Sequence, residues 1–323
     1  MMLATVLANP DADVADWNAL LTSARAEQLI ASLALRVAGR AVPERVAMIL
    51  ADALAASRQG RVHALWEAEM ARKALAPLNV PVILLKGTAF AAADIAAGEG
   101  RFIGDLDILV PRAALDAVER ALLGAGWEWV KPDPYDSLYY RRWMHELPPL
   151  IHRERDRMID VHHTILPPTA RPTPDPAAMI ADSILLDSGL RILSPNDMIV
   201  HAAAHLFADG DLAGGLRNLW DIDRLLRQFG ATGLSDRAAL HQLGPAVARA
   251  IRLSAHLFGT LVAADGLTAL DHAFLRRLTA RDGWGRSTRK ATQLAFYIRS
   301  HWIRMPPLLL ARHLWIKARR GAG

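Results

Sequence analysis

The sequence of 323 residues contains no cysteine. Disulfide bonds and thiolate metal sites are therefore excluded. It also lacks a long apolar run, because no stretch reaches the roughly 18 uninterrupted apolar residues that a membrane-spanning helix needs. Residues 1–16 have no basic segment followed by an apolar run, so we expect no secretory signal. Together these absences predict a cytoplasmic protein without a membrane span.

Acidic residues are scarce near the C-terminus. Residues 281–323 contain ten Lys and Arg but one acid, Asp282, while the whole chain carries a net charge of +5. Such a basic region is able to bind phosphates, an acidic peptide or a membrane surface. The alternative is a helical face that is simply exposed to solvent. The sequence leaves these alternatives open. A nucleic acid partner stays open as well but is not favoured.

The overall composition is that of a folded protein. Hydrophobic residues make up 52% of the chain and charged residues 22%. Both values are ordinary for globular domains and argue against disorder. The length allows one large domain or two.

Two aspartates open an apolar segment at residues 104–110. Asp105 and Asp107 are two residues apart, and on a strand such residues share a face. Neighbouring carboxylates repel each other, and hard divalent cations such as Mg²⁺ relieve that repulsion. The pair therefore predicts a metal site, although two aspartates at a strand end also cap turns. Arg101 precedes the pair and either steadies a phosphate group or is a loop arginine.

An apolar strand predicted over residues 82–85 runs into Lys86, Gly87 and Thr88, followed by a helix predicted over residues 88–97. A glycine turn before a helix offers backbone N–H groups to phosphate. The Lys86 ammonium is placed to reach phosphate oxygens, or it is a solvated strand end. Thr88 donates its hydroxyl to a phosphate, caps the helix, or does both.

A third acid, Asp160, lies in a strand pattern over residues 158–163. His162 shares its face and either orients Asp160, contacts a substrate, or packs structurally. His163 faces the other way and is expected to be structural. A third carboxylate near the first two completes a metal site and is also able to take a proton.

His201 and His205 are four residues apart, so on a helix they face the same side. A zinc site needs a third ligand, and no His-Glu-x-x-His pattern is present. We therefore expect packing or hydrogen-bonding roles, with a contact to a nucleotide or to Asp221 as the alternative.

These motifs together resemble a bacterial family of uncharacterised nucleotidyltransferases within the nucleotidyltransferase (DNA polymerase beta-like) superfamily. The resemblance covers about residues 15–230. Thr88 stands where the wider superfamily usually has Ser or Gly. The matching segments are Leu-Lys-Gly at 85–87, Arg101 through Val110, Asp-Val-His at 160–162, Ser194 through His205, and Leu216 through Asp221.

The resemblance implies transfer of a nucleoside monophosphate from an NTP to an acceptor hydroxyl, with two Mg²⁺ ions. It assigns three groups of residues: metal-binding and catalytic Asp105, Asp107 and Asp160; nucleotide-binding Lys86, Gly87, Thr88 and Arg101; and His162, His201 and His205 on the acceptor side or behind the metal ligands.

Two other functions stay open. The same fold is able to transfer a sugar or phosphoryl group to a peptide or natural-product acceptor. The chain is alternatively a non-catalytic interaction protein with a nucleotide site, although the intact acids argue against that. The acceptor, whether peptide, sugar or small molecule, is not identified by the sequence.

Periodicity and turn residues predict an α+β fold: a small mixed-sheet core, an N-terminal helical segment and an all-helical C-terminal half. We expect boundaries at residues 1–79, 80–167 and 168–323, with five prolines at 164–176 marking the second one. Helices are expected over 13–39, 43–78 and from about 177 to the end, and strands over 82–85, 104–110, 127–130, 138–144 and 158–163.

Overall fold

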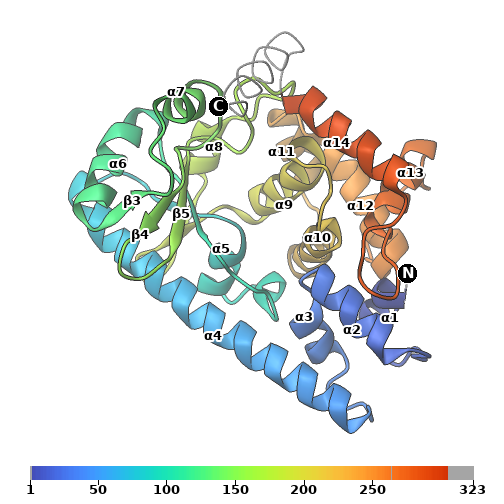
Figure 1. Ribbon diagram of the computed structural model, residues 1–323. Helices are drawn as coiled ribbons and strands as arrows, with labels where there is room; N and C mark the ends of the chain where they lie inside the picture. Colours follow the sequence, from blue (N-terminus) through green and yellow to red (C-terminus); the bar gives the residue numbers. More distant parts are fainter. Residues whose placement is uncertain (1, 263, 305–323) are drawn as a thin grey trace, which may run out of the picture.

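The computed structural model describes residues 2–262 and 264–304, and it has the predicted α+β architecture (Figure 1). A mixed sheet lies at one end of the molecule and helices pack around and beyond it. The strands are β1 (Ile83–Leu84), β2 (Leu106–Leu109), β3 (Trp127–Trp129), β4 (Leu150–His152), β5 (Met158–His162), β6 (Ile184–Leu185) and β7 (Arg191–Ile192). Their order in the sheet is β3-β4-β5-β2-β1-β7-β6.

Strand β2 occupies the middle of this order and is buried along its whole length. It runs antiparallel to β1 and parallel to β5. Its Leu-Asp-Ile-Leu sequence is that of a strand covered on both faces, apart from Asp107. An ionised side chain in such a place needs a compensating partner.

Helices precede the sheet, cover it and follow it. The helices that precede the first strand in the sequence are α1 (Met2–Ala8), α2 (Trp17–Ala26), α3 (Ile30–Arg36) and α4 (Glu44–Leu75). Those that lie between strands in the sequence are α5 (Lys86–Ala92), α6 (Leu115–Gly124), α7 (Pro134–Trp143) and α8 (Pro176–Ala181). Those after the last strand are α9 (Pro195–Ala204), α10 (Gly215–Phe229), α11 (Leu234–Leu240), α12 (Gly244–Phe258), α13 (Ala269–Leu278) and α14 (Lys290–Arg304).

The long helix α4 joins the two ends of the molecule (Figure 1), contacting α3 at one end and α5, α6 and β2 at the other. It follows Pro43 and begins with Glu44, and it has Arg72 and Lys73 in its last turn. An acid at the start and bases at the end both favour the helix dipole. The helix starting after Pro43 confirms the sequence prediction.

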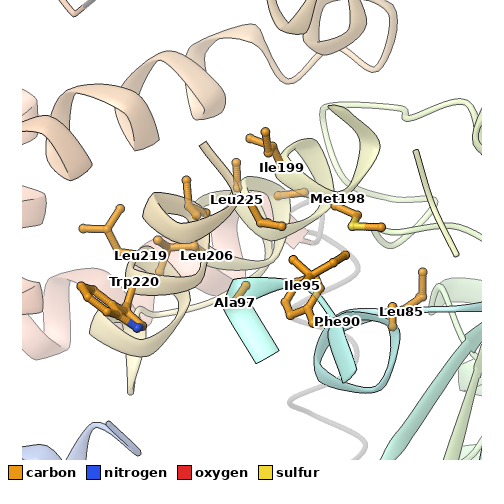
Figure 2. Close-up of a cluster of buried hydrophobic side chains, with 14 of the residues drawn as sticks. Leu85, Phe90, Ile95, Ala97, Met198, Ile199, Leu206, Leu219, Trp220 and Leu225 are labelled. Carbon is orange, nitrogen blue, oxygen red and sulfur yellow. The ribbon is translucent and has the colours of Figure 1, made fainter. Parts of the chain in front are cut away.

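Helices α9 and α10 form the wall that faces the sheet. Ser194 caps α9 by accepting a hydrogen bond from the Asp197 N–H, Pro195 is the first helical residue, and Gly230 ends α10, all as predicted. Figure 2 shows how buried side chains of α5 and its following turn interleave with those of α9 and α10. This packing fixes the start of α5 opposite α9. The labelled residues are Leu85, Phe90, Ile95, Ala97, Met198, Ile199, Leu206, Leu219, Trp220 and Leu225.

Three predicted elements were wrong in detail, and one helix was missed. The helix expected over 13–39 is divided into α2 and α3 at Gln28, whose φ is 55°, and α1 was missed. The strand expected over 138–144 is helix α7: its aromatic residues suggested a strand, but Pro134 starts a helix whose Arg141 binds Asp116 of α6. The helix expected over 88–97 begins two residues earlier and ends at Ala92.

The chain is also not helical throughout from residue 177. Residues 184–192 form the β6–β7 hairpin, in which β7 pairs parallel to β1 and extends the sheet. Each of these strands has two residues, too short for an alternation pattern. One continuous cluster of buried side chains includes residues from all three predicted segments, and their division into domains stays a prediction.

None of the described helices is both long enough and apolar enough to cross a bilayer. In the basic C-terminal region, three described arginines have contacts within the chain: Arg281 pairs with Glu27 at 2.7 Å, Arg289 donates to the Arg276 carbonyl, and Arg299 donates to the Phe207 carbonyl. Residues 305–323 of that region lie outside the described part of the chain. Binding of a partner there stays a prediction.

Candidate functional site

Three carboxylates gather at one edge of the sheet. In the parallel pairing of β2 with β5, Asp107 lies directly beside Asp160. Asp105 is exposed and immediately precedes β2. One oxygen from each of the three side chains lies within 4.8 Å of the other two. The three acids predicted from the strand patterns therefore lie together in the structure.

Asp107 is stabilised as an anion. Its Oδ1 accepts a hydrogen bond from Lys86 Nζ at 2.6 Å and lies 2.9 Å from His162 Nε2. Burial alone would raise the pKa of Asp107, but the charge of Lys86 and the hydrogen bond from His162 outweigh burial and hold that pKa well below its ordinary value. Both contacts use the same oxygen, so Oδ2 remains as a possible ligand atom.

Asp160 has the opposite electrostatics. Burial, then the carboxylates of Glu146 and Asp107, raise the pKa of Asp160 to about 7. Its neighbour His162 lowers that pKa, but less than the other groups raise it. The repulsion expected between the clustered acids thus raises the pKa of Asp160, and a bound cation would relieve that repulsion.

The donor set fits a hard divalent cation. Mg²⁺ prefers carboxylate oxygens and is commonly held by one or two carboxylates plus the phosphates of a nucleotide. Asp105, Asp107 and Asp160 supply oxygen donors at ligand-sharing distances. Burial and, after it, the carboxylates of Glu146 and Asp107 raise the pKa of Asp160, and a bound cation would stabilise its ionised form.

A pocket adjoins the acids on the side of Lys86, between the start of α5 and helices α9 and α10. The pocket is open to solvent, and its empty space including that open solvent is about 430 Å³. The polar residues that line it are Lys86, Arg101, His201, His205, Asn218 and Asp221. The structure therefore brings four of the predicted site residues to one pocket and links them to the acids through the Lys86–Asp107 contact.

Arg101 enters this pocket over Gly87. A Cβ atom added to Gly87 would lie 2.7 Å from Arg101 Nε and 3.1 Å from Ile103 Cγ1. The glycine turn expected before the helix is absent, since Gly87 lies within the first turn of α5 and Lys86 has the positive φ, 49°. Gly87 is thus explained by the close approach of Arg101.

The guanidinium of Arg101 pairs with Asp221 of α10. Its Nε is buried and has no hydrogen-bond partner among the described residues. The same is true of the hydroxyl of Thr88, which does not cap α5 because the helix begins at Lys86 and Leu85 is its N-cap. Buried polar atoms without partners are uncommon and are frequently satisfied by water or a ligand.

His201 is buried in the wall of this pocket. Burial, followed by the nearby charge of Lys86, lowers the pKa of His201 well below its ordinary value. His205 begins a π-helical turn, η4 (His205–Asp209), that continues α9. Such turns occur frequently at functional sites.

Sequence reasoning missed three participants. Arg217 is buried, pairs with Asp221 and donates to Ser32 Oγ at 2.7 Å and to the Ala97 carbonyl at 3.1 Å. Its spacing of four from Asp221 on an amphipathic helix was the available signal. His145 and Glu146 follow α7 and lie against His162. No local pattern marks them.

A family model described as "uncharacterised nucleotidyltransferase" matches residues 13–259 of the chain. A search of curated proteins found no match. Among solved structures, that of the antibiotic-resistance factor ANT(2'')-Ia aligns with a TM-score of 0.38 and 14% identity, covering 55% of this chain and 91% of that chain. At that TM-score the likeness supports no conclusion about substrate.

Proposed function

Since the chain belongs to the family of uncharacterised nucleotidyltransferases, we propose that it transfers a nucleoside monophosphate from an NTP to an acceptor hydroxyl and releases pyrophosphate. The observation that carries the proposal is the convergence of Asp105, Asp107 and Asp160, with their oxygens within 4.8 Å of one another. Clustered carboxylates beside a cationic pocket suit the binding of a metal–nucleotide complex.

In this assignment the three carboxylates hold Mg²⁺, two ions in the full complex. When bound there, Mg²⁺ supplies positive charge against the negative charge that develops during an in-line displacement at phosphorus. Lys86 and Arg101 move their hydrogen bonds from Asp107 and Asp221 to phosphate oxygens. The buried Nε of Arg101, which has no partner among the described residues, supplies a further donor.

Asp160 acts as the general base for the acceptor hydroxyl. It takes the proton of that hydroxyl while the hydroxyl oxygen bonds to the α-phosphorus. The bond between the α-phosphorus and the leaving pyrophosphate oxygen breaks in the same step. Burial and the neighbouring carboxylates raise the pKa of Asp160 to about 7 without a cation, and a bound cation that relieves this repulsion keeps Asp160 ionised and able to accept the proton. His162 keeps Asp107 in place through its 2.9 Å contact, and His201 and His205 border the pocket from α9.

The experiment identifies the transferred group by its mass. Purified protein is incubated with NTPs, Mg²⁺ and a mixture of hydroxyl-bearing peptides, sugars and small molecules, and products are found by mass. We expect an added mass of one nucleoside monophosphate. An added sugar or phosphoryl group alone would contradict the proposal and favour the alternative transferases.

The Asp160→Asn variant tests the assigned role. Its NTP affinity should stay within a few-fold of the wild type, while transfer falls by roughly 10²-fold or more. Equal losses in affinity and transfer would make Asp160 a nucleotide ligand instead. Asp52→Asn, a change of an exposed acid on α4, is the matched control and should leave both unchanged.

A further inference from the structure

A second group of possible metal ligands lies beside the three acids. It consists of His145, Glu146 and His162, whose ligand atoms all lie within 4.8 Å of one another. The imidazole rings of His145 and His162 stack with centroids 5.3 Å apart. The carboxylate Oε2 of Glu146 lies 3.4 Å from His162 Nδ1 and 3.7 Å from His145 Nε2.

Backbone pairing holds this cluster in place. Glu146 forms an antiparallel bridge with His162. On either side of it, the His163 N–H donates to the His145 carbonyl and the Leu147 N–H donates to the Val161 carbonyl, both at 2.9 Å. His145 and His162 are both buried. The three ligands are therefore positioned by the sheet rather than by a mobile loop.

Each ring nitrogen of His162 faces a carboxylate oxygen. Its Nε2 lies 2.9 Å from Asp107 Oδ1, and its Nδ1 faces Glu146. A neutral imidazole has one N–H. If that proton lies on Nε2 and is donated to Asp107, the Nδ1 lone pair faces a carboxylate oxygen, and two acceptors oppose each other. A metal ion between them would be bound by both.

We infer that His145, Glu146 and His162 form a binding site for a divalent transition metal of the zinc class, separate from the carboxylate site for Mg²⁺. Two imidazoles and one carboxylate are ligands that such ions prefer, whereas Mg²⁺ prefers oxygen. Asp107 then acts as the outer partner of a metal-bound histidine: it accepts the Nε2–H and fixes the ring, an arrangement found repeatedly around such ligands.

The site has a consequence for the neighbouring acids. A metal on His162 Nδ1 keeps the proton on Nε2, and therefore keeps the hydrogen bond to Asp107. Occupancy of this site thus positions Asp107, the buried carboxylate of β2. The inference stands on the geometry of the cluster and does not require that the chain transfers nucleotides.

Co²⁺ is the probe, because its visible absorption reports nitrogen ligands and geometry. The full chain is first stripped of metal with a chelator. It is then titrated with Co²⁺ in excess Mg²⁺, which occupies oxygen-only sites. We expect one equivalent to bind with an absorption band that Zn²⁺ removes. His145→Ala and, separately, Glu146→Gln should weaken this binding by about tenfold or more, the range seen even for loss of outer partners.

Two variants serve as controls. Asp105→Asn changes the carboxylate site alone and should leave the Co²⁺ band intact, and His272→Ala removes an exposed histidine on α13. The inference is overturned if the wild type binds no Co²⁺ in Mg²⁺, if both cluster variants bind it unchanged, or if Asp105→Asn loses the band as well. Circular dichroism confirms folding, and Glu146→Gln decides the matter if His145→Ala does not fold.

Discussion

Removing the charge of Asp160 should stabilise the protein when no cation is present. Burial and the neighbouring carboxylates raise the pKa of Asp160 to about 7, from an ordinary value of 3.8. The folded protein therefore binds a proton at Asp160 more tightly than the unfolded chain does. At neutral and higher pH, ionisation of Asp160 lowers the free energy of unfolding. Asp160→Asn removes this destabilisation.

The sign and size follow from linkage. Between pH 3.8 and about 7 the folded state holds more protons than the unfolded state, so stability falls as the pH rises, and the cost is complete above about 7. Each pH unit between the two pKa values corresponds to about 1.4 kcal/mol, which sets an upper bound of about 4 kcal/mol. At roughly 2–4 °C per kcal/mol for chains of 150–250 residues, this bound corresponds to a gain of at most about 8–16 °C.

Thermal unfolding in a chelator checks this prediction. Asp160→Asn should melt above the wild type at pH 8, with a difference that shrinks toward pH 5, while Asp52→Asn matches the wild type at both. Added Mg²⁺ should stabilise the wild type and narrow the difference. A variant that melts below the wild type at pH 8, or a difference independent of pH, would refute the electrostatic reasoning.

Three further predictions concern neighbouring residues. Asp107→Asn should lower the free energy of unfolding by about 3–5 kcal/mol, because Lys86 loses its buried ion partner; chemical denaturation measures this, and a variant as stable as the wild type would argue against the pair. Arg217→Met should destabilise by a similar amount by leaving the buried Asp221 with one ion partner fewer, whereas Arg58→Met, a change of an exposed arginine on α4, should not. Gly87→Ala should displace Arg101 and weaken NTP binding about tenfold or less, since a side chain gives way more easily than backbone; unchanged calorimetric affinity would remove Arg101 from the nucleotide site.

The three acids were predictable because their placement depends on local rules. Strand alternation predicted Asp105 beside Asp107 and Asp160 on one face with His162, although Asp105 immediately precedes β2 in the structure. Adjacent parallel strands then set Asp107 against Asp160. The helix start at Ser194 and the stop at Gly230 were predictable for the same reason, since caps are read from neighbouring residues.

Contacts between distant segments were not predictable. The sequence suggested that both aspartates of the pair suffer repulsion, whereas Lys86 and His162 stabilise Asp107 and the repulsion falls on Asp160. Glu146, which helps to raise that pKa, reaches the site from the segment after α7, beyond the strand that was expected over residues 138–144. Its contribution depends on the pairing of that segment with β5, which no local pattern specifies.

Secondary structure failed where tertiary contacts decide it. The aromatic run at 138–144 favours a strand by propensity, but Arg141 of helix α7 binds Asp116 of α6. The hairpin at 184–192 consists of strands too short for periodicity, and it exists because β1 has an open edge for β7. The hairpin thus depends on its neighbouring strand, whereas α7 also has a helix start of its own at Pro134.

Calorimetric titration with an NTP tests the central claim, that the three carboxylates form a metal–nucleotide site, most directly. Wild type, Asp105→Asn and Asp107→Asn are compared in Mg²⁺ and in a chelator, with Asp52→Asn as the control. The account predicts binding by the wild type and the control in Mg²⁺ only, and its loss in both site variants, with folding verified by circular dichroism. Unchanged Mg²⁺-dependent affinity in Asp105→Asn and Asp107→Asn would contradict it.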